Sequence, residues 1–151
     1  MKYIIKTIVL VVLLFSACNT ELLEKDNPNE LRGEAYFENE LQLQAAVNAI
    51  YAALQANQLY NREYFFLHDM LSDENVPNSQ LEAPRRAVLT YNLNPGNLLI
   101  VSVWQGLYRV IHRANFVIAN VENVSELEIT EESRNRFEGE ARFLRAWAYF
   151  E

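Results

Sequence analysis

The chain of 151 residues has one cysteine, Cys18, and no long apolar run. A single cysteine excludes a disulfide within the chain, and with no histidine nearby it is a poor metal ligand. The apolar stretch 8–15 is far shorter than the about 20 residues that a transmembrane helix needs. Gly-rich phosphate loops, nucleophile elbows and paired-cysteine motifs are also missing from the sequence. The sequence therefore gives no positive indication of catalysis and predicts no cofactor.

The first 17 residues are typical of a secretory signal. Lys2 and Lys6 form a positive amino-terminal region, and the apolar stretch 8–15 follows it. Ser16 and Ala17 are the small residues that a signal peptidase requires. Residues 1–17 are therefore predicted to be a signal peptide rather than part of the fold.

Cys18 follows this signal directly, at the position of a bacterial lipobox cysteine, which is acylated and becomes the mature amino terminus. Phe15 stands where a lipobox usually has leucine, and a chance cysteine behind an ordinary signal peptide is the alternative. Each buried CH₂ of an acyl chain contributes roughly 0.8 kcal/mol, so two chains anchor a protein stably. We expect Cys18 to be lipidated and residues 18–37 to be a tether leading into the fold.

Basic residues are scarce in the mature chain. Removing residues 1–17 takes Lys2 and Lys6 from the 13 basic side chains, which leaves 11 against 20 acidic ones and a net charge of −9. Such a surface repels phosphate backbones, so nucleic acid is not expected as a partner.

Apolar periodicity predicts four helices and an all-α fold. The first begins after Asn39, with Gln42 as its capping-box partner, and ends at Asn57. The second spans about 62–71, although residues 64–67 could instead form a buried strand. The third spans about 99–121 with Asn97 near its cap, and the fourth begins after Thr130. The predicted apolar faces are Leu43, Ala46, Val47, Ile50 and Leu54; Trp104, Leu107, Tyr108, Ile111, Asn115 and Ile118; and Phe137, Ala141, Leu144 and Ala148.

Residues 72–97 are predicted to be a long irregular loop, with Val88–Leu93 as an extended candidate inside it. A connection of this length is usually functional or disordered. The last predicted helix has no stop signal and reaches Tyr149 and Phe150 in full apolar periodicity. We therefore expect region 38–151 to be incomplete, a natural short chain being the alternative.

Ordered motifs along the mature chain resemble the SusD/RagB family of nutrient-uptake lipoproteins. They are Cys18–Glu24, Tyr36-Phe37, Ala46–Leu54, Leu71-Ser72-Asp73-Glu74, Trp104–Asn115 and Gly139–Phe150. The resemblance implies a tetratricopeptide-like helical repeat, a SusD-like α–α superhelix, at the outer membrane. It also implies a surface-exposed, lipid-anchored protein that is not an enzyme. Such a protein binds oligosaccharide or another nutrient and delivers it to a TonB-dependent, SusC-like transporter.

Carbohydrate sites need an aromatic face for the sugar ring and polar groups for its hydroxyls. The 72–97 segment offers both, and Asp73, Asn75, Arg85 and Tyr91 are the candidate ligand-binding residues. A loop that contacts only protein is the alternative. A cation site is one interpretation of His68, Asp69, Asp73 and Glu74, but we favour helix capping and solvated charge. A binding role is one interpretation of Glu140, Arg142 and Arg145, but we favour a structural role. Trp104 is expected to lie in the core.

Two other functions remain open at this stage. One is a helical-repeat lipoprotein that binds only protein, and the other is an anchored glycoside hydrolase. Binding of a glycan separates the first from the proposed nutrient binder, and hydrolysis of a glycan by the purified protein would favour the second.

The lipid anchor is directly testable. Cys18→Ala should abolish acylation, because the thiol that forms the thioether is gone, and should release the protein from membranes. Radiolabelled palmitate incorporation and membrane fractionation measure the two effects. A Cys18→Ala protein that still sediments with the outer membrane would show the assignment to be wrong.

Overall fold

A computed structural model describes residues 37–151, and the predicted signal peptide, Cys18 and most of the tether lie outside this range. The elements are α3 (Glu40–Leu54), α4 (Glu63–Leu71), α5 (Ala83–Leu89), α6 (Leu98–Asn120), the short 3-10 helix η2 (Val121–Asn123) and α7 (Glu131–Phe150). No strand occurs among these residues. The predicted all-α fold is confirmed, and the alternative of a strand at 64–67 is wrong.

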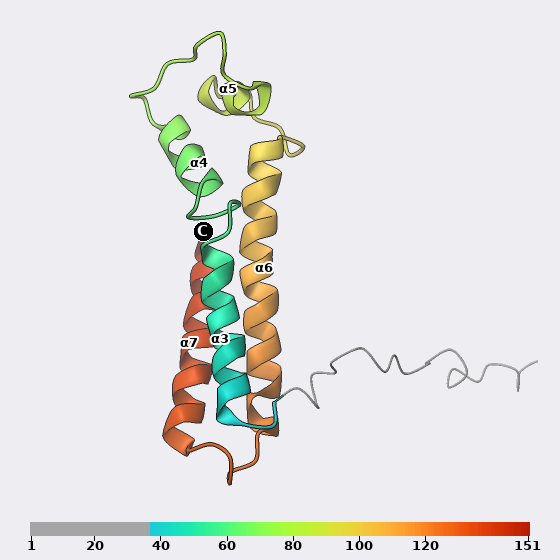
Figure 1. Cartoon of the computed structure of the whole chain (residues 1–151). Coiled ribbons are helices and arrows are strands. Elements are labelled where there is room, and N and C mark those ends of the chain that lie inside the picture. Colours follow the sequence, from blue (N-terminus) through green and yellow to red (C-terminus); the bar gives the residue numbers. More distant parts are fainter. Residues whose placement is uncertain (1–36) are drawn as a thin grey trace, which may run out of the picture. The chain divides into compact units, whose positions relative to one another are not determined.

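Three long helices form an antiparallel bundle (Figure 1). Helices α3 and α7 run in one direction and α6 runs in the opposite direction, and each of the three packs on the other two. Helices α4 and α5 lie beyond the end of the bundle where α3 ends and α6 begins. Fully buried side chains along the shared seam are Leu43, Val47, Ile50, Val110, Ala114, Val117, Phe137 and Ala141. No helix among residues 37–151 is long and apolar enough to cross a bilayer.

Each long helix begins at the predicted cap. The Asn39 side chain accepts a hydrogen bond from the Gln42 amide at 3.0 Å, and Gln42 accepts one from the Glu38 amide. Asn97 accepts from the amides of Leu99 and Ile100, and Thr130 accepts from the amide of Ser133. These bonds satisfy amide groups that have no partner inside the helix. The predicted starts of the three long helices are therefore confirmed.

The end of α3 differs from the prediction. The helix stops at Leu54 rather than Asn57, because the chain turns back and the Tyr60 amide donates to the Leu54 carbonyl at 3.0 Å. This turn carries Leu59 into the core, where it is fully buried. The burial of Leu59 therefore accompanies a helix end three residues earlier than predicted.

The predicted irregular loop contains a helix. Val88 and Leu89, expected to be extended, belong to α5 and are buried with Met70 and Leu99. Pro84 lies in the first turn of α5, where its fixed φ and missing N–H suit a helix start. The extended prediction is therefore wrong for Val88 and Leu89, because burial of these two side chains, four and five residues after Pro84, favours a short helix.

The predicted apolar face of α6 is rotated from the real one. Trp104 is 60% exposed, so its predicted core position is wrong, and Tyr108 and Asn115 are exposed as well. The buried face instead includes Val103, Leu107, Val110, Ala114 and Val117. Because α6 carries apolar residues on most of its circumference near its start, periodicity alone did not select the side that α3 and α7 cover.

Gly106 allows the turn after α3 to approach α6 closely. A Cβ at this position would lie 2.9 Å from Gln58 Cβ and 2.9 Å from Leu59 Cγ, whereas a Cβ at Gly139 would meet nothing within 4 Å. Only Gly106 is therefore required by packing.

We expect Gly106→Ala to destabilise the fold relative to Gly139→Ala by about 1–3 kcal/mol, the typical cost of overpacking. Both substitutions gain the same helix propensity, up to about 1 kcal/mol, so their difference isolates the clash. Urea unfolding followed by circular dichroism measures it. Equal midpoints for the two variants would contradict the close approach at Gly106.

Candidate functional site

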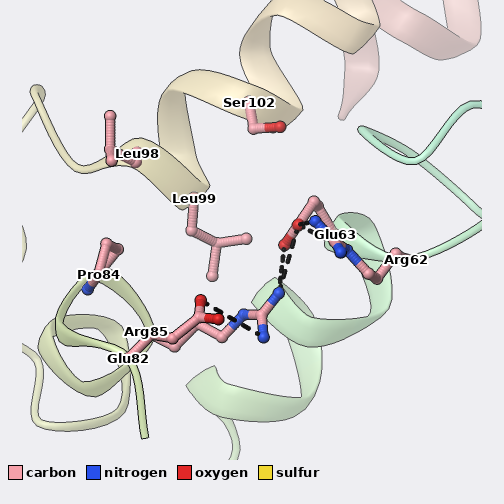
Figure 2. A pocket seen from close by; sticks show the side chains of 8 residues that line it. All are labelled: Arg62, Glu63, Glu82, Pro84, Arg85, Leu98, Leu99 and Ser102. Atoms are coloured by element: carbon pink, nitrogen blue, oxygen red, sulfur yellow. Dashed lines mark hydrogen bonds and ion pairs between the residues drawn. The ribbon is translucent and has the colours of Figure 1, made fainter.

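Helices α4 and α5 and the start of α6 surround a small charged pocket (Figure 2). The pocket encloses about 160 Å³. It is lined by Arg62, Glu63, Glu82, Pro84, Arg85, Leu98, Leu99 and Ser102. The 72–97 segment, which is predicted to bind ligand, supplies Glu82, Pro84 and Arg85 to this pocket.

Arg85 crosses the pocket between two carboxylates, as Figure 2 shows. Its guanidinium lies 3.3 Å from a Glu63 oxygen and 3.6 Å from a Glu82 oxygen. The same group lies 4.4 Å from the centre of the Phe66 ring, a cation–π contact. Arg85 therefore ties α5 to α4, and its donors already point at protein groups.

Glu63 is the centre of this arrangement and only 7% exposed. It accepts hydrogen bonds from both Arg62 and Arg85, so the buried carboxylate is compensated by two cations. Sequence analysis did not select Glu63 or Phe66. Their shared partner, Arg85, lies 22 residues from Glu63 in the sequence, and no local spacing signals such a contact.

Tyr91 is held in an unusual backbone conformation at the end of α5. Its φ is +55°, the left-handed region that glycine usually occupies. The Tyr91 amide donates to Val88 and the Asn92 amide donates to Ala87, the bonding pattern of a Schellman motif. The Tyr91 hydroxyl donates to the Leu71 carbonyl at 2.6 Å, yet the residue remains 62% exposed. The hydroxyl end of the side chain is thus fixed while more than half of the residue's surface meets solvent.

Asp73 and Asn75 lie in the turn that follows α4, and both are exposed. Asn75 donates to the Asp69 carbonyl at 2.7 Å and to the Ser72 hydroxyl at 3.3 Å. Within residues 37–151 no hydrogen bond or ion pair links Asp73, Asn75, Arg85 and Tyr91 to one another. The structure places the four candidates on one segment but does not join them.

An exposed aromatic pair on α6 was not predicted as a site. The rings of Trp104 and Tyr108 are 4.7 Å apart between centroids, and both are exposed. Beside them lies a mainly apolar hollow of about 480 Å³, lined by Pro95, Ile100, Val101 and Trp104. The i,i+4 spacing of Trp104 and Tyr108 is the sequence feature that could have indicated this pair. Sequence analysis placed both residues on the predicted apolar face of the helix instead.

The other charged candidates have protein partners. Arg142 lies 2.5 Å from Glu138, an i,i+4 pair on α7, and Arg145 donates to Asn115 of α6 at 2.8 Å. These contacts support the structural interpretation of the two arginines, which stays a prediction, and the Arg145–Asn115 bond joins α7 to α6. Among the residues that the structure describes, no cluster of three or more His, Cys, Asp or Glu side chains has metal-binding geometry.

A second aromatic cluster lies where α4 meets the end of α7. Tyr60 stacks on Trp147 at 5.6 Å, and Tyr64 donates its hydroxyl hydrogen to Glu151. Burial, and then the bond to the Glu151 carboxylate, raise the pKa of Tyr64 well above its ordinary value. Burial also raises the pKa of Tyr60. The Tyr64 hydroxyl is therefore held as a hydrogen-bond donor to Glu151.

Comparison with known proteins decides the family. The profile of a SusD-like family, described as starch-binding and associating with the outer membrane, matches residues 21–151. The chain belongs to the SusD-like family. The match covers all of the helices described above.

Individual SusD-like relatives agree with this result. SusD-like protein P25 of Formosa agariphila is 29% identical and SusD-like protein P2 of the same organism is 25% identical, each over 95% of this chain. A SusD-like protein of Bacteroides ovatus is 28% identical over 99% of this chain. The chain spans only about 28% of the length of the two Formosa agariphila relatives. No solved structure gives a significant match.

The Glu63 arrangement yields a prediction for the α4–α5 region. Glu63→Gln should lower its local stability by about 1–3 kcal/mol, because hydrogen bonds to a charged group are replaced by weaker ones next to partly buried arginines. Faster hydrogen exchange at the amides of Val88 and Leu89, with unchanged exchange in α3, is the expected measurement.

Glu138→Gln is the matched control, since it weakens the exposed pair with Arg142 and should change stability by no more than about 0.5 kcal/mol. Equal effects of the two substitutions would show that the Glu63 contacts do not hold α5 in place.

Proposed function

We propose that this chain is part of a non-catalytic outer-membrane lipoprotein that binds oligosaccharide and delivers it to a TonB-dependent, SusC-like transporter. Its family is described as starch-binding and outer-membrane-associating, which supports the ligand class and the location. Lipidation at Cys18 would supply the membrane attachment. A shallow site of low affinity suits such a role, because tight binding would slow transfer to the transporter.

Tyr91 is the observation that carries the ligand proposal. A tyrosine in a left-handed position costs of order 1 kcal/mol that glycine would not, and strained positions of this kind cluster at functional sites. The hydrogen bond to Leu71 fixes the hydroxyl end of the side chain, and the exposed surface of the residue is available for stacking on a sugar. A preset ring loses little entropy when ligand binds.

Neighbouring groups complete the proposed surface. Asp73 and Asn75 supply exposed side-chain oxygens for sugar hydroxyls, and both lie in the turn that follows Leu71. Trp104 adds a second exposed aromatic face, located beyond the 92–97 connection that starts next to Tyr91. Arg85 contributes by holding α5, which positions Tyr91, rather than by contacting ligand.

Calorimetry with maltoheptaose, followed by a panel of other neutral oligosaccharides, tests the proposal. Tyr91→Gly should weaken binding about 10-fold, equivalent to about 1.4 kcal/mol, because the stacking face is lost. The unfolding midpoint should change little, because glycine relieves the backbone cost while the bond to Leu71 disappears. Tyr149→Ala is the control, since Tyr149 is also 62% exposed but lies on α7.

Other outcomes would replace the proposal. A loss of affinity confined to Trp104→Ala would move the site from Tyr91 to α6. Failure to bind any glycan, together with retained binding of the transporter, would favour the protein-binding scaffold. Cleavage of the oligosaccharide during titration would identify a hydrolase.

A further inference from the structure

Asn97 contributes hydrogen bonds to two helices at once. Its side-chain oxygen caps α6 and accepts from the amides of Leu99 at 2.9 Å and Ile100 at 3.4 Å. Its side-chain amide donates to the Pro84 carbonyl at 2.8 Å, in the first turn of α5. The residue is only 6% exposed. One buried side chain therefore joins the start of α5 to the start of α6.

The bond between Asn97 and Pro84 closes the loop that carries Tyr91. Tyr91 lies midway between the two ends of this 84–97 loop, in its left-handed backbone conformation. Fixing the ends of a loop reduces the number of conformations that its middle can adopt. The bond from the Tyr91 hydroxyl to the Leu71 carbonyl holds the side chain separately, at the end of α4.

The other contacts of α5 do not duplicate this bond. Arg85 ties α5 to Glu63 of α4, and the buried side chains of Val88 and Leu89 make apolar contacts that have no fixed direction. Within residues 37–151 no other hydrogen bond links α5 to residues 97–120. The orientation of the 84–97 loop relative to α6 therefore depends on the Asn97 amide.

We propose that Asn97 is a positioning residue for ligand binding, and that it acts by holding Tyr91 in place. This inference rests on the proposed function, in which Tyr91 stacks on a sugar. Asn97 does not contact the ligand itself, because it is buried and both its oxygen and its amide nitrogen have protein partners. Its role is to reduce the entropy that the loop loses when ligand binds.

The two bonds of Asn97 can be separated by substitution. Aspartate has the same shape and is an equally good helix cap, so Asn97→Asp retains the bonds to the α6 amides. An ionised carboxylate has no donor for the Pro84 carbonyl, and the two acceptor oxygens repel each other. Asn97→Ser is a second variant that also caps a helix but introduces no buried charge.

Asn39→Asp is the matched control. Asn39 caps α3 by accepting from the Gln42 amide at 3.0 Å, and its side-chain amide donates to no residue within 37–151. The same chemical change is thus made at a helix cap that closes no loop.

Calorimetry with maltoheptaose at neutral pH tests the inference. Asn97→Asp and Asn97→Ser should each weaken binding about 5-fold, whereas Asn39→Asp should leave affinity unchanged. In the Tyr91→Gly background both Asn97 substitutions should change affinity by less than about 2-fold, because a positioning effect disappears with the group that is positioned. A purely structural role of Asn97 would give the same loss in both backgrounds.

Hydrogen exchange tests the positioning directly. The Tyr91 and Asn92 amides, which donate to the Val88 and Ala87 carbonyls, should exchange faster in Asn97→Asp than in Asn39→Asp. Equal exchange at these amides would overturn the inference, as would equal losses of affinity in the two backgrounds.

The outcome for the unsubstituted protein separates this inference from the proposed function. If that protein binds the oligosaccharide and both Asn97 variants bind it equally well, the inference fails and the proposed function stands. If the unsubstituted protein binds no glycan, the proposed function fails, and the ligand role of Asn97 fails with it.

Discussion

The burial of α6 between α3 and α7 is the constraint on which the rest of this structure depends. Small residues at the seam, Ala114 on α6 and Ala141 on α7, are fully buried and let the helix axes approach, while Val117 and Phe137 fill the space beside them. At the far end of α6, the Arg134 guanidinium of α7 donates to the Val121 and Val124 carbonyls. The position of α6 in turn fixes the end of the 72–97 segment, which leads directly into this helix.

That segment is stabilised by different means from the bundle. Its own apolar cluster is small, four buried residues around Val88 and Leu99, and the charged contact between Glu63 and Arg85 supplements it. A buried ion pair adds geometric definition more reliably than net stability, because desolvation offsets much of the attraction. The end of the molecule that carries Tyr91 is therefore well positioned yet easier to open locally than the helical seam.

Sequence predicted what local chemistry determines and missed what distant contacts determine. The caps at Asn39, Asn97 and Thr130 depend on residues within four positions, and all three were predicted correctly. The end of α3, the helix at α5 and the buried side of α6 depend on Leu59, Met70 and the neighbouring helices, and each was wrong in detail. The ligand candidates stay predictions. One of them, Arg85, pairs with Glu63 of α4, a contact that the 72–97 segment alone does not indicate.

Exposed aromatic residues on this chain fall into two chemical kinds, and the difference decides how each surface should be interpreted. Tyr91 and Trp104 combine a ring face with a donor, so they can remain in water at modest cost and still stack on a polar ligand. Phe143 and Phe150 have no such group, and with Gly139 and Ala146 they form a continuous apolar line whose exposure is unfavourable by the hydrophobic effect alone. The exposure of these aromatic residues alone would assign both surfaces to ligand binding. The presence or absence of a hydrogen-bond donor on the ring distinguishes a surface suited to a polar ligand from one suited to apolar packing.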